Sequence, residues 1–168
     1  MTMGFPEIAI SVMAIVSLYT DLSTQRVPNL LTFGGMALGV AWGLSQGSWL
    51  ASLGGIGVAF ACMFPGWMFA RAVRAGDAKL LMAFGALLGP EDIFRACALT
   101  YVLNLPFGLV VLAAKGRLGN IPRVIRASYG KVTGQAVVAE PMEVTVVPFV
   151  PVVVAATLLA MHTEVLRW

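Results

Sequence analysis

The sequence predicts an all-α integral membrane protein with six transmembrane helices, the fourth of them short. The first reason is composition: apolar residues make up 59% of the 168 residues and charged residues only 11%, and the mean hydropathy is +0.88. Soluble domains average about 45–50% apolar and about 25% charged residues. A domain of this size still exposes roughly a third of its chain surface, so a soluble fold could not bury so much apolar surface. The apolar composition also excludes a disordered chain.

The second reason is the length of the apolar segments, because a helix needs about 20 apolar residues to cross a bilayer. Segments 3–20, 28–47, 49–70, 93–114 and 144–161 meet this requirement, with only Glu7 and Arg95 as charges, each near one end. Segment 80–89 is apolar but short, and from Asp77 to Pro90 it would rise only about 20 Å. We therefore expect the fourth helix to begin below the membrane surface. The first segment has no preceding basic residue and no small-residue cleavage site, so we read it as a retained helix.

The basic residues predict the orientation of a single domain that covers residues 1–168. Loops 21–29, 71–79 and 115–143 hold nine of the eleven Lys and Arg residues. Basic loops stay in the cytoplasm, so these three loops are expected there and both termini outside. Basic and apolar residues alternate in the 115–143 loop in a way that suits a short interfacial helix on the lipid surface. The basic residues form no stripe with interleaved aromatics, so we expect no nucleic-acid partner.

Several classes of site are excluded by residue counts. Two Cys and one His cannot build a four-Cys zinc site or a His-based metal centre. No Ser-His-Asp or Cys-His set and no phosphate-binding glycine loop is present, so we expect neither a metal ion nor a cofactor. In the second segment, Gly35, Gly39, Gly43 and Gly47 recur every four residues, which predicts one helix face that a neighbouring backbone can approach closely.

Two carboxylates stand apart from the other acidic residues. Asp21 directly follows the first apolar segment and Asp77 directly precedes the short fourth one, so both lie at cytoplasmic helix ends. An ionisable residue at membrane depth indicates a functional site. Two close carboxylates in a water-poor place share one proton, as in aspartic proteases, where one activates water and the other polarises the peptide carbonyl. Position alone leaves open the simpler interpretation that both residues mark helix boundaries.

The residues around each aspartate resemble those of the type IV prepilin peptidases, which belong to the Gly-x-Gly-Asp intramembrane aspartyl proteases. Val27, Pro28 and Asn29 follow Asp21 at the spacing of the first family motif. Gly76, Asp77 and Lys79 match the second motif, whereas Arg74 stands where that motif has its first Gly. The resemblance implies that Asp21 and Asp77 are the catalytic residues of a site on the cytoplasmic side.

The resemblance also implies a substrate and a location. The substrate would be a prepilin or pseudopilin, which has a short basic leader before a long apolar helix, and the enzyme would be a multi-pass protein of the bacterial inner membrane. Val27–Pro28 and Gly76 would offer backbone that pairs with an extended substrate. Glu140 and Glu143, the other carboxylates expected in the cytoplasm, would attract the basic leader. Lys79 would either tune the pKa of Asp77 or extend to the membrane surface.

The short connection between the first two segments has no Cys and no room for the cytoplasmic domain of the long prepilin peptidases. The chain is therefore similar to the short form of Flp/Tad-type pilus assembly systems, whose assembly machinery would be a partner, and we do not expect methyltransferase activity. Two other functions stay open: a small transporter in which the aspartates relay protons, and an inactive membrane scaffold. The oligomeric state cannot be predicted.

Overall fold

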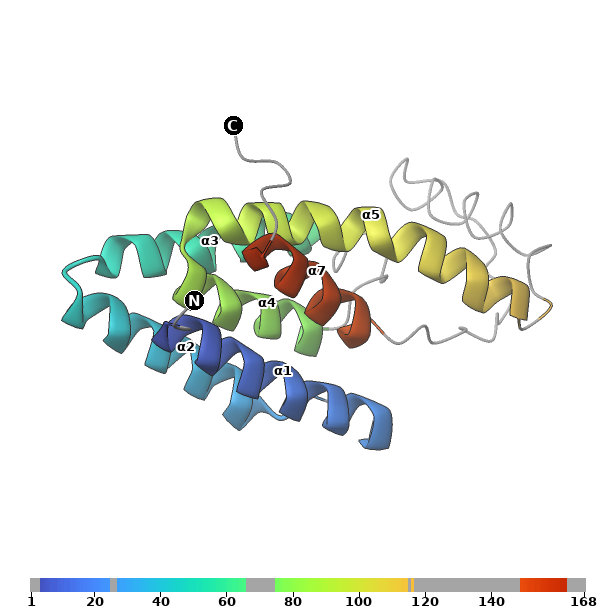
Figure 1. Cartoon of the computed structure of the whole chain (residues 1–168), viewed down its shortest axis with the longest axis horizontal. Coiled ribbons are helices and arrows are strands. Elements are labelled where there is room, and N and C mark those ends of the chain that lie inside the picture. The colour runs from blue at the N-terminus through green and yellow to red at the C-terminus, as the bar shows by residue number, and fades with distance from the viewer. Residues whose placement is uncertain (1–3, 25–26, 66–74, 115, 117–148, 163–168) are drawn as a thin grey trace, which may run out of the picture.

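The computed structural model describes residues 4–24, 27–65, 75–114, 116 and 149–162, and within these ranges the regular secondary structure is all helix (Figure 1). Six helices are present there: α1 Phe5–Thr24, α2 Asn29–Ser45, α3 Trp49–Pro65, α4 Ala75–Leu88, α5 Pro90–Ala114 and α7 Val150–His162. Each of them falls on one of the six predicted segments, which confirms the all-helical class. The fourth helix has 14 residues and is short, as expected.

Two of the described helices are long and apolar enough to cross a membrane, namely Phe5–Thr24 and Pro90–Val111. Trp49–Pro65 and Val150–Met161 are shorter apolar helices. The predicted third and sixth spans continue into residues 66–70 and 144–148, which lie outside the described residues. The predicted interfacial helix of the 115–143 loop also lies outside them, apart from Gly116.

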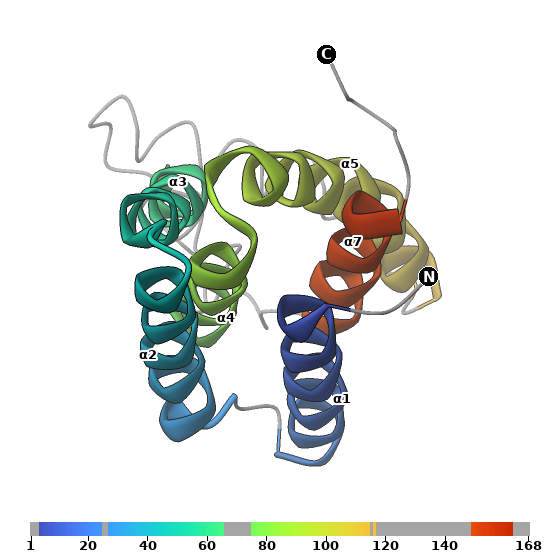
Figure 2. The same ribbon diagram turned by 60° about the vertical axis from the view of Figure 1, so that its left-hand side comes forward.

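The helices pack side by side with alternating direction, and α4 lies in their middle (Figure 2). It contacts each of the other five described helices. Eight of its 14 residues are buried, including Leu80, Leu81 and Phe84, none of which is exposed at all. A helix that is apolar on all sides is expected in a core position. α4 is therefore the central element against which the other helices are placed.

The glycine face predicted for α2 exists, but it ends one glycine early. A Cβ added to Gly39 would lie 2.8 Å from the Ala86 backbone carbon, and one added to Gly43 would meet the Ser52 hydroxyl. Gly47 was predicted to share this face, and that prediction is wrong. α2 ends at Ser45, and Gly47 has a φ of 70° and no atom within 4 Å of an added Cβ.

The reason for the early end is a helix-terminating turn. The Gly47 N–H donates to the Leu44 carbonyl at 3.2 Å, and the Ser48 N–H donates to the Gly43 carbonyl at 2.8 Å. This is the pair of hydrogen bonds of a Schellman motif, which needs a left-handed residue just after the helix. Glycine takes that conformation at little cost. Gly47 thus forms the turn into α3 and does not contribute to helix packing.

Candidate active site

Asp21 lies inside the last turn of α1 and not after it, because the helix continues to Thr24. The buried residues of α1 recur at helical spacing and end with this carboxylate: Ile10, Met13, Ala14, Ser17 and Asp21. Asp21 is 5% exposed. Its side chain therefore continues the inward face of the helix. A residue that only marked a helix boundary would not need to be buried.

Asp77 lies in the first turn of α4 and is 2% exposed. The free N–H groups of a first helical turn carry a partial positive charge that favours a carboxylate. The residue is thus placed by the start of the most buried helix of the bundle. The depth of this helix start in the membrane stays a prediction.

The two aspartates lie at the same end of the bundle. Met13, Gly35 and Ala83 meet in one layer, where a Cβ added to Gly35 would lie 2.8 Å from Met13 Sδ and 3.1 Å from Ala83 Cβ. At 1.5 Å per residue, Asp21 lies about 12 Å past Met13 along α1, and Asp77 lies about 9 Å from Ala83 along α4. Both distances run toward the same end because α1 and α4 are antiparallel (Figure 1).

The residues that flank the two aspartates are in contact with each other. A Cβ added to Gly76 would lie 3.6 Å from Val27 Cβ, which is ordinary contact. Lys79 Nζ donates a hydrogen bond to Asn29 Oδ1 at 3.1 Å. Pro28 precedes α2 in an extended conformation, and its carbonyl accepts hydrogen bonds at the start of that helix. The structure therefore joins the two sequence motifs into one site.

A comparison with known families agrees with this arrangement. The sequence model described as the type IV leader peptidase family matches residues 8–111, which include both aspartates and their flanking residues. The chain belongs to the type IV leader peptidase family. The resemblance to prepilin peptidases is thereby confirmed, and a peptidase function of this general kind is established. No curated protein and no solved structure is similar enough to the chain to count as a match.

Three residues near the candidate site were missed from the sequence. Ser17 and Thr32 are completely buried, one turn from Asp21 and from Asn29 respectively. The Ser17 hydroxyl donates to the Ala14 carbonyl at 3.0 Å, and the Thr32 hydroxyl donates to the Asn29 carbonyl at 3.1 Å. The third is Phe33, whose ring centroid lies 4.9 Å from Lys79 Nζ. The signal for all three was their spacing of three or four residues from a motif residue.

Other predicted site residues of the peptidase lie outside the described part of the chain. Glu140 and Glu143 fall there, as does Arg74, so their roles stay predictions. Among the described residues, no group of three or more His, Cys, Asp or Glu side chains is arranged to hold a metal ion. Of the Lys and Arg residues of the chain, the described ranges include Lys79 and Arg95. Arg95 forms an ion pair with Asp92 at 3.0 Å, near the opposite end of the bundle.

Proposed function

We propose that this peptidase is an intramembrane aspartyl endopeptidase that removes the basic leader from prepilins or pseudopilins at the cytoplasmic boundary of the membrane. The observation that carries the proposal is the burial of two carboxylates, Asp21 and Asp77, at one end of a helical bundle within a leader peptidase chain. No other pair of buried acidic side chains is present in the described residues.

The proposed mechanism uses the two carboxylates in opposite protonation states. Two carboxylic groups held close together and away from bulk water bind one proton between them. The charged aspartate removes a proton from a water molecule, whose oxygen attacks the scissile carbonyl carbon. The protonated aspartate donates its proton to the carbonyl oxygen. Collapse of the tetrahedral intermediate then breaks the C–N bond. The leaving amine takes the proton that the first aspartate removed from water, and the second aspartate takes back a proton from a hydroxyl of the intermediate.

A prepilin fits this site by its own chemistry. Its scissile bond lies where a polar leader meets an apolar helix, which is the depth we assign to Asp21 and Asp77. A helical substrate would keep its carbonyl groups in hydrogen bonds, so the cleaved segment must be extended locally. The extended backbone at Pro28 and the contact between Val27 and Gly76 lie beside Asp77 and offer a place for that segment. Glu140 and Glu143 are proposed to attract its basic leader.

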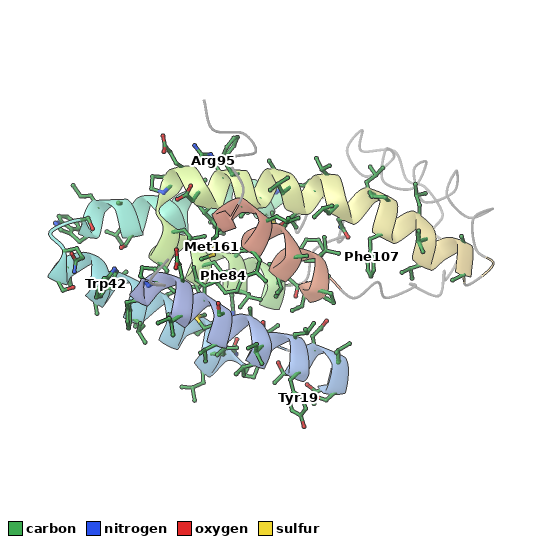
Figure 3. All side chains as sticks on the ribbon, viewed as in Figure 1. Tyr19, Trp42, Phe84, Arg95, Phe107 and Met161 are labelled. Carbon is green, nitrogen blue, oxygen red and sulfur yellow. The ribbon has the colours of Figure 1, made fainter. Side chains whose placement is uncertain are left out.

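We further propose that all six helices belong to a multi-pass arrangement in the bacterial cytoplasmic membrane, with the aspartates on the cytoplasmic side. Large apolar side chains face outward along α1 and α5, including Ile15 at 68% exposed and Val102 at 67% exposed. Trp42 stacks on Phe5 at 4.5 Å between ring centroids, at the end of the bundle opposite Tyr19 (Figure 3). Aromatic residues at both ends of a bundle suit the two membrane interfaces.

The short connection between α1 and α2 supports the Flp/Tad-type form, in which pilus assembly machinery would be a partner. A proton-relay transporter has less support. Its relay would need linked polar groups along the bundle, but the buried Thr100 and Thr157 hydroxyls each donate to a carbonyl of their own helix, those of Ala96 and Val153. Each hydroxyl donor is thereby satisfied within its own helix.

The test of the proposed function is cleavage in proteoliposomes that contain the purified chain and a synthetic prepilin with its leader. We expect two products, separated at the junction of leader and apolar helix, which mass spectrometry identifies. A matched prepilin whose leader lysines and arginines are replaced by Gln should be cleaved less well. Proton flux without cleavage would instead favour the transporter, and neither activity would favour the scaffold.

The proposed orientation predicts which residues can be labelled from outside the cell. Ser23 lies at the aspartate end of α1 and Ser48 lies in the turn between α2 and α3, and both are exposed. In a background with Cys62→Ala and Cys97→Ala, a membrane-impermeant maleimide should label Ser48→Cys in intact cells. It should label Ser23→Cys only after the membrane is permeabilised. Labelling of Ser23→Cys in intact cells would contradict the orientation.

A further inference from the structure

Lys79 reaches across from α4 to the first turns of α2. Its Nζ donates to Asn29 Oδ1 at 3.1 Å and lies 4.9 Å from the centroid of the Phe33 ring. Asn29 and Phe33 are four residues apart, so they lie on one face of α2. A Lys ammonium over an aromatic face is attracted by the ring as well as by the amide oxygen. Lys79 therefore has two contacts with the same face of α2.

The Lys79 side chain points away from the direction of Asp77 because of the position of Lys79 on α4. Residues two apart on a helix do not face each other. Asp77 accordingly is directed into the bundle, at 2% exposed, while Lys79 is only half-buried. Within the described part of the chain, the hydrogen bond of Lys79 to Asn29 and its contact with the Phe33 ring are both with α2. A role of Lys79 toward Asp77 or toward the membrane surface stays a prediction, to which these contacts add a role at the start of α2.

The contacts between the two motifs bracket Asp77. Gly76, directly before it, packs on Val27, and Lys79, two residues after it, binds Asn29. Val27 and Asn29 belong to the chain that leaves α1, the helix of Asp21. We propose that Lys79 is a positioning residue that holds the start of α2 against the first turn of α4 and so fixes Asp77 relative to Asp21. This inference rests on the proposed aspartyl protease function.

The kinetic consequence follows from the geometry that such a pair requires. Shared-proton chemistry needs both carboxylates within hydrogen-bond reach of one water molecule and one carbonyl. A displacement of about 1 Å at a catalytic group can lower a rate by about a hundredfold. Loss of a positioning contact should therefore lower kcat, whereas loss of a substrate contact should raise KM.

The experiment is a double-mutant cycle on prepilin cleavage in proteoliposomes. Lys79→Met keeps the apolar stem and removes the charged donor, and Asn29→Ala removes the acceptor. Each should lower kcat about ten- to a hundredfold and change KM by less than about threefold. The double variant should be no worse than the poorer single one, because residues that act as a unit are not additive. Leu30→Ala is the matched control, since Leu30 is the exposed neighbour of Asn29 at 86% exposed, and it should leave kcat unchanged.

Conservative variants give a second measurement that does not depend on Lys79→Met folding. Lys79→Arg keeps a cationic donor that also stacks on aromatic rings, and Asn29→Asp keeps the acceptor, so both should retain most of the activity. Phe33→Trp should be active and Phe33→Leu should be weaker. The limbs of the pH–rate profile should stay in place both in Lys79→Arg and in the residual activity of Lys79→Met, because a residue that acts only by positioning leaves the titration of the aspartate pair unchanged.

Four outcomes would overturn the inference while wild-type cleavage leaves the proposed function standing. These are an unchanged kcat in Lys79→Met, a raised KM at constant kcat, additive effects of Lys79→Met and Asn29→Ala, and a shifted pH–rate profile in Lys79→Met. A raised KM would assign Lys79 to the substrate. Failure of the proposed function would appear differently, as absence of cleavage by the wild-type chain.

Discussion

Asp21→Asn and Asp77→Asn should each abolish prepilin cleavage while the protein stays folded and inserted. Asn has nearly the same shape as Asp but can neither accept a proton from water nor share one with its neighbour. We expect a loss of at least about a thousandfold in kcat, of the size seen when one member of a catalytic unit is removed. The assay is single-turnover cleavage of a prepilin in proteoliposomes, with melting temperatures to check folding.

The double variant gives the sharper result. If the two aspartates act as one unit, Asp21→Asn with Asp77→Asn should cost little more than either change alone. Asp92→Asn is the matched control, because Asp92 also lies in the first turn of a helix but near the other end of the bundle, where it pairs with Arg95. It should cleave like the wild type. Robust cleavage by either single variant at the site would return both aspartates to the role of helix-boundary residues.

The same mechanism sets the shape of the pH–rate profile. One aspartate must be charged to accept a proton and the other must be protonated to donate one, so kcat should rise and then fall with pH. At low pH the aspartate that acts as the base is protonated and cannot accept a proton from water. At high pH the aspartate that acts as the acid is deprotonated and cannot donate a proton to the carbonyl oxygen. The two limbs belong to the pair and not to either residue alone. A rate that rises with pH to a plateau would remove the proton-donating partner from the mechanism.

The helices and the two aspartates could be predicted because both depend on local sequence. Apolar length and composition located six segments, and each of them overlaps one described helix. The end of the first helix was placed before Asp21 because a charged residue ends an apolar run. The helix nevertheless continues to Thr24, since the polar residues after it can each satisfy a helical backbone locally, as Ser23 and Thr24 do by donating to the carbonyls of Tyr19 and Thr20.

The contacts between helices could not be predicted in the same way. The spacing of Phe33 and Thr32 from Asn29 puts them near a motif residue, but it does not say which face of α2 meets α4, and only the packing of the two helices shows that. The contact of Lys79 with Asn29 joins residues 50 positions apart, and sequence spacing carries no distance information at that range. Gly47 shows the opposite error. Its four-residue spacing fitted the glycine face of α2, but the turn into α3 requires a residue in the left-handed conformation at this position, and Gly47 supplies it.

The contact between α3 and α4 at their facing glycines is expected to be a sensitive point of the fold. Gly55 of α3 and Gly85 of α4 face each other, so that a Cβ added to either one would meet the carbonyl of the other. A Cβ on Gly55 would also lie 3.0 Å from the backbone carbon of Gly89. Backbone atoms cannot move aside as the end of a flexible side chain can. Even the smallest side chain at this point must therefore separate α3 from α4.

Gly55→Ala should lower the free energy of unfolding by about 1–3 kcal/mol, the usual cost of overpacking a tight core. Gly57→Ala is the matched control on the same helix, because nothing lies within 4 Å of its added Cβ. That change should be neutral or stabilise by up to about 1 kcal/mol, since Ala favours a helix more than Gly does. Unfolding in detergent micelles measures both variants. Gly55→Ala should also lower the cleavage rate, because the helix that it displaces carries Asp77. Equal stability of the two variants would show that α3 and α4 do not approach at Gly55 and Gly85.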